Sequence, residues 1–231
     1  MPTSRHERSL RAAGYRAIAG VDEAGRGALF GPVFAAAVVL DPARPIRGLD
    51  DSKQLEPERR EVLARRIRER AAAWAVAGAD AYEIDRINIL QASRLAMRRA
   101  VERLHPCCDY LLVDFVSVDV PLPQRGLVHG DAVSFSIAAA SILAKVARDA
   151  ALRCWAEVFP EYGFGSNKGY MTPEHVTALD RLGPTSLHRF SFQPVRACCR
   201  PGQPVWGGYP CPQRAFPEQA FPQQGELFAC R

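Results

Sequence analysis

Hydrophobic and polar positions follow two rhythms along the chain, and these rhythms predict the elements of the fold. Short apolar runs that favour buried strands occur at residues 16–22, 31–40, 74–79 and 110–113. Longer segments with apolar residues on one face favour helices at about residues 57–72, 84–104 and 137–157. Because strands and helices alternate, the pattern predicts an α/β fold in which helices cover a sheet.

The two ends of the chain differ in character from this central region. Residues 1–14 are polar and basic and lack the apolar core of a secretory signal. From residue 198 onward prolines recur at short intervals, with glutamine and glycine between them, so residues 198–231 are expected to be a disordered tail. One folded domain is therefore expected at residues 15–197. No apolar run is long enough to cross a membrane, and a cytoplasmic, monomeric protein without membrane association is expected.

The composition narrows the function classes only slightly. The 231-residue chain has a formal net charge of +5 and a hydrophobic fraction of 48%, as expected of a mildly basic globular protein. This charge permits a polyanionic partner without requiring one. The seven cysteines are scattered and lack the spacing of a zinc site.

Four carboxylates stand where α/β folds usually place their chemistry. Asp22 and Glu23 end the first predicted strand, Asp114 ends another, and Asp131 comes just before a predicted helix. If they converged they would repel one another, and Mn²⁺ or Mg²⁺, which prefer oxygen ligands, would neutralise them. A pair of such ions about 3.5–4 Å apart is the usual apparatus for hydrolysing a phosphodiester.

Each of these carboxylates also has an ordinary structural interpretation. Asp131 alone is more typical of a helix cap than of a metal ligand, and Asp22 and Glu23 could simply face solvent. Asp114 follows four apolar residues, where an unpaired charge would cost free energy. From spacing alone, a metal site and a set of structural carboxylates are equally open.

The tripeptide Gly25-Arg26-Gly27 follows these carboxylates directly. Two glycines around one residue let the backbone approach a ligand closely, although a plain turn between two strands is the other interpretation. Neighbouring residues of a regular strand point to opposite faces, so Asp22 and Glu23 reach one site only if the chain bends. We therefore expect a bulge or a strand end at Glu23, with Gly25 absorbing the turn.

Together these segments resemble the bacterial ribonuclease HII family, and the resemblance covers roughly residues 15–196. It is carried by five motifs in the family's order. These are residues 20–27 (GVDEAGRG) with Gly31-Pro32-Val33, residues 49–55 (LDDSKQL) with Arg60-Glu61, Val113-Asp114, Gly130-Asp131 with residues 136–149, and residues 168–172 (KGYMT) with His175, Gly183 and residues 188–192.

The resemblance implies a ribonuclease H-like fold, a central mixed β-sheet flanked by helices with a small C-terminal helical region. It implies that Asp22, Glu23, Asp114 and Asp131 are catalytic ligands of Mn²⁺ or Mg²⁺. The expected activity is a ribonuclease H endonuclease that cleaves RNA–DNA hybrids and nicks DNA duplexes on the 5′ side of embedded ribonucleotides. The products would carry 5′-phosphate and 3′-hydroxyl ends.

The resemblance also implies how the substrate is bound. Gly25, Arg26 and Gly27 would contact the 2′-hydroxyl of the ribonucleotide, the group that distinguishes RNA from DNA. Tyr170 would stack on the sugar of the next nucleotide, and Lys53 and Lys168 would contact phosphates.

The sequence departs from the family's common pattern at Phe115, His129, Asn167 and Met171. Phe115 and Met171 could narrow the site, and His129 could make a phosphate contact pH-dependent. Asn167 stands where a histidine is frequent, which puts that histidine's role near the scissile phosphate in doubt.

The end of the tail contains Gln224, Leu227 and Phe228 in the order Gln-Gly-Glu-Leu-Phe. This is similar to the short peptide by which bacterial replication proteins bind the sliding clamp, although such a match in a glutamine-rich tail can be coincidental. For the whole chain, two alternatives to the nuclease are a catalytically silent hybrid-binding protein and a junction resolvase of the same architecture. The intact carboxylates argue against the first, and Gly25-Arg26-Gly27 argues against the second.

Overall fold

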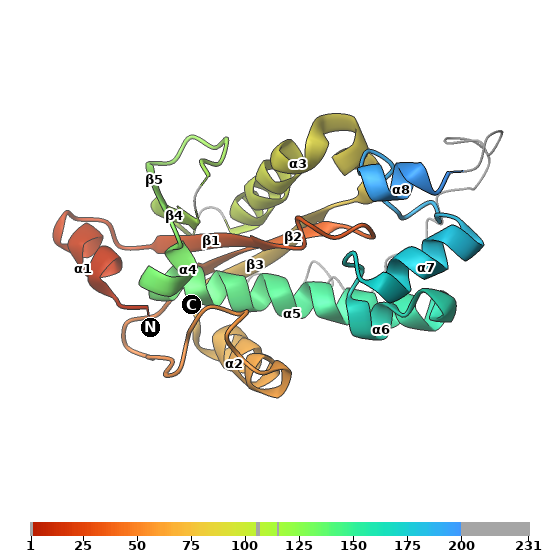
Figure 1. Ribbon diagram of the computed structural model, residues 1–231. Helices are drawn as coiled ribbons and strands as arrows, with labels where there is room; N and C mark the ends of the chain where they lie inside the picture. Colours follow the sequence, from red (N-terminus) through yellow and green to blue (C-terminus); the bar gives the residue numbers. More distant parts are fainter. Residues whose placement is uncertain (1, 105–106, 115, 200–231) are drawn as a thin grey trace.

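A computed structural model describes residues 2–104, 107–114 and 116–199 (Figure 1). Its centre is a five-stranded sheet in the order β3-β2-β1-β4-β5. The strands are β1 (Ile18–Ala24), β2 (Val33–Val39), β3 (Ala73–Ala79), β4 (Tyr110–Asp114) and β5 (Gln124–Leu127). β1 pairs antiparallel with β2 and parallel with β4, β2 with β3 antiparallel, and β4 with β5 parallel. The mixed sheet implied by the family resemblance is confirmed.

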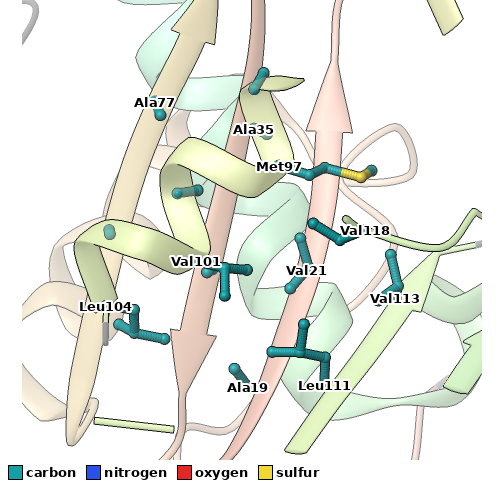
Figure 2. Close-up of a cluster of buried hydrophobic side chains, with 14 of the residues drawn as sticks. Ala19, Val21, Ala35, Ala77, Met97, Val101, Leu104, Leu111, Val113 and Val118 are labelled. Atoms are coloured by element: carbon teal, nitrogen blue, oxygen red, sulfur yellow. The ribbon is translucent and has the colours of Figure 1, made fainter. Parts of the chain in front are cut away.

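Helices cover both faces of this sheet, as Figure 1 shows. The helix α3 (Ala81–Leu104) packs on one face, and α5 (Phe135–Val158), with α2 (Pro57–Arg70) beside it, packs on the other. Figure 2 shows Ala19 and Val21 of β1 and Leu111 and Val113 of β4 in the cluster on the α3 face. Because side chains alternate along a strand, Asp22 and Asp114, which directly follow Val21 and Val113, belong to the face covered by α5.

The start of α5 lies unusually close to β1. A Cβ atom at Gly20 would lie only 2.0 Å from the carbonyl carbon of Ser136, so only glycine allows this approach. Farther along α5, Ala138, Ala139 and Ala140 are fully buried against the sheet. The small residues of this helix therefore place its first turns directly against the strand that carries Asp22.

Shorter helices form the C-terminal region, beyond one end of the sheet. They are η1 (Pro160–Tyr162), α6 (Phe164–Asn167), α7 (Pro173–Leu182) and α8 (Gln193–Ala197). Their core is aromatic and includes the loop after β1, because Phe30 stacks on Phe164 with ring centroids 3.9 Å apart. The loop carrying Gly25 is thereby joined to the C-terminal region, and the small C-terminal helical region predicted from the resemblance is confirmed.

Three features of the fold were not predicted from the periodicity. The polar N-terminal stretch contains a helix, α1 (Arg5–Ala12), and the short edge strand β5 has no clear apolar alternation. The helix α3 is interrupted at Asn88, whose φ of 65° lies in the left-handed region. Over the described ranges, no helix has the length and apolar character needed to cross a membrane.

Candidate active site

The pairing of β1 with β4 brings Asp22 and Asp114 to neighbouring positions. Val21 pairs with Val113 in this parallel register, so the two aspartates are the next residues along adjacent strands. Asp22 is only 4% exposed. Asp114 accepts a hydrogen bond from the Gly130 amide at 2.7 Å, which ties the end of β4 to the start of the next helix, α4 (Gly130–Val133). A solvent-facing position for Asp22 is therefore excluded.

Glu23 is the next residue of β1 and occupies a regular position in the strand. The register of β1 with β2 is regular through the pair Ala24–Phe34, so of the two predicted alternatives, a bulge or a strand end at Glu23, the bulge is wrong. The strand ends one residue later, and Gly25, with a φ of +98°, makes the turn as predicted. The regular register persists because Ala24 still packs with the core on the α5 face. Glu23 lies close enough to Asp114 for the Asp114 charge to raise its pKa.

Asp131 enters from α4 together with a carboxylate that sequence reasoning did not assign to the site. His129 is the N-cap of α4, so Asp131 does not cap the helix. The buried Asp131 side chain lies next to Asp51 and 3.7 Å from Lys53 Nζ. Asp51 belongs to the Asp51-Ser52-Lys53 motif, and its place two residues before Lys53 was the signal that could have revealed it.

Ser141 of α5 lies beside the Asp22 carboxylate, and Ser52 is linked to Asp22 through Ser141. The Ser141 hydroxyl donates a hydrogen bond to Asp22, and the Ser141 and Ser52 hydroxyl oxygens lie 2.8 Å apart. Both serines are buried. The network joins β1, α5 and the Asp51-Ser52-Lys53 segment, and it orients Asp22 through uncharged groups.

Negative charge at this point exceeds the positive charge available to balance it. Burial, and then the charges of Glu23 and Asp114, raise the pKa of Asp22 well above its ordinary value. Burial also raises the pKa of Glu23 against the opposing effect of Arg26. For Asp131, burial and then Asp51 and Asp114 raise the pKa against the effect of Lys53. We call Asp22, Glu23, Asp114 and Asp131 the carboxylate site.

Lys53 faces the carboxylate site from its solvent side. Its side chain is 78% exposed. Partial desolvation lowers the pKa of Lys53, but Asp51 and Asp131, followed by Asp22 and Asp114, together raise it above its ordinary value. The predicted phosphate-binding lysine thus lies beside the carboxylates, where it can reach a bound polyanion.

The donor set of the carboxylate site fits hard divalent cations, because all its ligands are carboxylate oxygens that repel one another. Over the described residues, no three His, Cys, Asp or Glu side chains converge closely enough to hold one ion as they stand. Glu23 is turned onto Arg26, with Oε1 3.3 Å from Nη1, and Asp131 lies toward Lys53. Side-chain rotation toward a shared cation would complete the site, and it would relieve the repulsion that raises these pKa values.

Gly25-Arg26-Gly27 forms the rim next to the carboxylate site. Gly25 lies on Arg148, since a Cβ there would come within 2.3 Å of Arg148 Nε. The Arg26 carbonyl accepts a hydrogen bond from Arg189 Nη1 at 2.8 Å, and Gly27 has open space around its Cα. The tripeptide is thus held from below by two buried arginines, and the face around Gly27 is free for close approach of a ligand.

Tyr170 lies on the other side of Arg148. The Arg148 guanidinium carbon is 4.6 Å from the centre of the Tyr170 ring, and its Nη2 donates to the Lys168 carbonyl. Tyr170 is 37% exposed, and Lys145 Nζ lies 5.9 Å from the centre of the same ring. We call Gly25-Arg26-Gly27, Arg148 and residues 168–170 the Tyr170 region. Arg148 was part of a quoted motif but was not predicted to link the two recognition segments.

The predicted phosphate ligand Lys168 belongs to a basic group in this region. Burial lowers the pKa of Lys168, Asp149 opposes this effect, and the positive charges of Arg153, Lys145 and Arg148 lower the pKa further. Its Nζ donates to the Gly165 carbonyl of the same loop. Mutual repulsion among these cations favours a bound phosphate, although Lys168 must leave Gly165 to reach one.

The sequence departures have simple local accounts where the structure describes them. Asn167 is buried, and its side chain donates to the Tyr162 carbonyl and accepts from the Gly169 amide, both at 2.7 Å. It shapes the loop below Tyr170 and does not face the carboxylate site. Met171 is 59% exposed and His129 is exposed, so neither fills a buried space. Phe115 and the predicted clamp-binding residues Gln224, Leu227 and Phe228 lie outside the described residues.

Two buried histidines, His175 and His188, support residues 168–172, which we call the Tyr170 loop. The Thr185 amide donates to His188 Nδ1 at 2.9 Å, so the other nitrogen, Nε2, carries the proton and donates to His175 Nε2 at 3.1 Å. His175 Nδ1 in turn donates to the Tyr170 carbonyl at 2.9 Å. Burial, and then the neighbouring His175, lower the pKa of His188 to about 3, and burial also lowers that of His175. Both rings are therefore neutral at pH 7.

Comparison with known proteins agrees with this geometry. The family model for ribonuclease HII matches residues 19–195. The chain is 66% identical over 194 residues to the ribonuclease HII of Solibacter usitatus (strain Ellin6076), covering 84% of this chain and 85% of that one.

Solved structures show the same fold. The crystal structure of ribonuclease H2 from Pyrococcus horikoshii OT3 has a TM-score of 0.67 and 27% identity over 79% of this chain and 97% of that chain. The PCNA:RNase HII complex from Archaeoglobus fulgidus has a TM-score of 0.66 and 27% identity with the same coverage.

Proposed function

Because the chain belongs to the ribonuclease HII family, divalent-metal-dependent endonucleases that hydrolyse the RNA strand of RNA–DNA hybrids, we propose that it also nicks DNA duplexes on the 5′ side of embedded ribonucleotides. The observation that carries this proposal is one juxtaposition. Gly25, at the start of the rim, and Tyr170 contact the same Arg148 side chain, and the strand that ends at this rim bears Asp22 and Glu23.

The carboxylate site would supply the hydrolysis. Asp22, Glu23, Asp114 and Asp131 would hold Mn²⁺ or Mg²⁺, and a bound pair of such ions activates the attacking water and stabilises the leaving 3′ oxygen, so that the products are a 5′-phosphate and a 3′-hydroxyl. Ser141 orients Asp22 by a hydrogen bond, and the Gly130 amide orients Asp114. Lys53, at the solvent side of these carboxylates, would attract a phosphate toward them.

The Tyr170 region would choose the point of cleavage. Because the space beside Gly27 is open and the Arg26 side chain is exposed, a 2′-hydroxyl could approach the backbone of Gly25-Arg26-Gly27 closely. Tyr170 would stack on the next sugar, with Arg148 behind the ring keeping it in place. Such an arrangement needs only one ribonucleotide for recognition, because the 2′-hydroxyl and the adjacent sugar belong to a single junction.

The test is a labelled DNA duplex that contains one ribonucleotide, incubated with Mn²⁺ or Mg²⁺. We expect a nick on its 5′ side, no cleavage of the all-DNA duplex, and cleavage of the RNA strand in an RNA–DNA hybrid. Binding without cleavage would instead indicate a silent hybrid-binding protein. Cutting of a four-way DNA junction in preference to the ribonucleotide would indicate a resolvase.

Replacing Tyr170 with alanine tests the selection step separately from the hydrolysis. We expect kcat/KM for the single-ribonucleotide duplex to fall by about 10- to 100-fold, the scale of about 1–3 kcal/mol for stacking of a nucleotide on an aromatic ring. The neighbouring Met171→Ala is the control, because Met171 is an exposed residue of the same loop, at 59% against 37% for Tyr170, and has no aromatic ring. Equal rates for wild type and Tyr170→Ala would contradict the assigned stacking role.

The C-terminal tail is proposed to bind a sliding clamp through Gln224, Leu227 and Phe228. The motif supports this, and a similar protein, the ribonuclease HII of Archaeoglobus fulgidus, was solved in complex with PCNA. A pull-down with the bacterial clamp should succeed with the full chain and fail after deletion of residues 220–231. Capture that is unaffected by the deletion would end this part of the proposal. The cytoplasmic location, the monomeric state and the boundaries at residues 14 and 197 stay predictions.

A further inference from the structure

The helix α1 contains a buried carboxylate for which the proposed hydrolysis has no use. Glu7 is 3% exposed, although α1 is polar on average and lies before residues 19–195, the part matched by the family model. An acidic side chain is almost never fully buried unless it is held by hydrogen bonds or an opposite charge. The contacts of Glu7 therefore indicate what α1 does.

Glu7 binds the junction between α4 and α5. Its Oε1 accepts from the Ser134 hydroxyl at 2.6 Å, from the Ser136 amide at 3.0 Å and from the Ser136 hydroxyl at 2.5 Å. The Ser134 oxygen also accepts from the Ile137 amide and so caps the first turn of α5. The other carboxylate oxygen, Oε2, is buried without a hydrogen-bond partner among the described residues.

The backbone beside Glu7 is joined to the same junction. The Thr3 amide donates to the Val133 carbonyl at 3.2 Å, and the Phe135 amide donates to the Thr3 carbonyl at 3.3 Å. Figure 1 shows α1 next to α4 at this end of the sheet. Residues 3–7 thus attach to both sides of the turn that separates the two helices.

This junction lies between the supports of two carboxylates of the active site. Asp131 is three residues before Ser134, in a helix of only one turn that cannot hold its own orientation. On the other side, Ser136 packs against Gly20, which is two residues before Asp22. A shift of the junction would therefore change the distance between Asp131 and Asp22.

From this placement we propose that Glu7 is a positioning residue for the Asp131 carboxylate, acting through Ser134 and Ser136. This inference rests on the proposed function, because it assumes that Asp131 is a metal ligand. Glu7 touches neither substrate nor reacting atoms. It holds α4 against the start of α5, so that Asp131 faces Asp22 and Asp114 before a cation binds, and the cation has less ordering to perform.

The decisive comparison is between Glu7→Ala and Glu7→Gln. Alanine removes all three hydrogen bonds, whereas glutamine keeps its Oε1 and changes only Oε2, the atom that has no partner. Arg8→Ala is the matched control, because Arg8 is an exposed charged residue on the same helix. The proposal requires that glutamine retain most of what alanine loses.

The first readout needs neither metal nor catalysis. Amide hydrogen exchange of the metal-free full chain, followed by mass spectrometry, should show faster exchange over residues 130–137 in Glu7→Ala. Exchange over the strand residues 33–39 should be unchanged, and Glu7→Gln and Arg8→Ala should match the wild type. Unchanged exchange over residues 130–137 in a folded Glu7→Ala protein would overturn the proposal.

The second readout is the kinetics of nicking at a single ribonucleotide. In Glu7→Ala, kcat should fall and the Mn²⁺ concentration for half-maximal rate should rise, each by about 10- to 100-fold, as expected for a group that orients a metal ligand. The KM for the duplex should change little, since the Tyr170 region is untouched. An unchanged kcat and Mn²⁺ midpoint would contradict the positioning role. A wild type without nicking activity would instead contradict the proposed function. The exchange experiment would then still test whether Glu7 holds α4 against the start of α5.

A third variant covers the case in which Glu7→Ala does not fold. Ser136→Ala removes the hydrogen bond from the Ser136 hydroxyl to Glu7 and keeps the hydrogen bond from the Ser136 backbone amide. It should shift the exchange and the Mn²⁺ midpoint in the same direction by a smaller factor. Wild-type behaviour of Ser136→Ala in both measurements would count against the proposal.

Discussion

The carboxylate site and the Tyr170 region are neighbours that handle charge in opposite ways. In the carboxylate site like charges gather on a rigid frame, and burial together with mutual repulsion raises the pKa of Asp22, Glu23 and Asp131. In and below the Tyr170 region two buried arginines are paired in part with backbone carbonyls. Arg148 donates to the Lys168 carbonyl, and Arg189 donates to the carbonyls of Gly31 and Arg26, while Arg148 Nε and Nη1 and Arg189 Nη2 have no hydrogen-bond partner among the described residues.

Because of this difference, substitutions in the carboxylate site and in the Tyr170 region should have different effects on stability and activity. Charges that are matched within the fold contribute to stability, and their removal should unfold the protein more easily. Charges that are left unmatched weaken the fold and become useful only with a ligand of opposite charge. Removal of an unmatched charge should therefore cost activity while it leaves the fold intact or strengthens it.

The largest effect is expected from Asp114→Asn, which breaks the carboxylate site alone. The rate of nicking should fall by at least about 10³-fold, the scale for loss of a group that stabilises transition-state charge. Affinity for the duplex should be kept, because one negative charge near the phosphates is removed. The measurements are single-turnover cleavage and a binding titration. A rate equal to that of the wild type would show that the metal assignment is wrong.

Next in size is Arg189→Met, which tests the matched charges. The substitution leaves the carbonyls of Gly31 and Arg26 without their buried donor, so the free energy of unfolding should fall by about 3 kcal/mol. Urea unfolding of the full chain measures this loss. Arg26→Met is the control, because the Arg26 side chain is 42% exposed and should change stability by less than about 0.5 kcal/mol. Equal stability of the two variants would remove the contrast.

A drop in pH should weaken the support of the Tyr170 loop. The pKa of His188 is lowered from its ordinary value of 6.5 to about 3. Below pH 6.5, His188 is therefore protonated in the unfolded chain while it stays neutral in the folded chain. The stabilisation is present above pH 6.5 and is lost progressively as the pH falls toward 3. For His188 alone, the free energy of unfolding should decrease by about 2 kcal/mol between pH 7 and pH 5.

The control for this pH effect is His188→Gln, whose side chain does not titrate. Its free energy of unfolding should be lower than that of the wild type at pH 7, but it should decline less between pH 7 and pH 5. Parallel pH profiles for the two proteins would contradict the assignment of a neutral, buried His188.

The smallest effect has the opposite sign. Asp22→Asn removes one of the unmatched charges and keeps an oxygen that accepts from the Glu23 amide, so the metal-free protein should gain about 1 kcal/mol in stability. The same variant should be inactive. Added Mn²⁺ should raise the melting temperature of the wild type, and it should raise that of Asp22→Asn much less. A less stable Asp22→Asn protein would show that Asp22 is structurally matched after all.

Most elements of the fold could be predicted from local sequence patterns. Apolar periodicity predicted four of the strands and the three long helices, because each needs only a local pattern to bury one face. Asp114 stands at the end of β4, as predicted, and Asp22 and Glu23 lie within two residues of the end of β1. Gly25 was predicted to make the turn, since only a residue that tolerates positive φ can follow a strand in this way.

The contacts between residues far apart in the sequence could be seen only in the tertiary structure. Arg148 lies between Gly25 and Tyr170, Asp51 joins Asp131, and Glu7 binds Ser134 across 127 residues of sequence. None of these contacts follows from a local pattern, because each depends on how two separate elements are oriented in the packed fold. The regular register at Glu23, where a bulge or a strand end was predicted, has the same origin. Packing of Ala24 with the core outweighed the local argument for a bend.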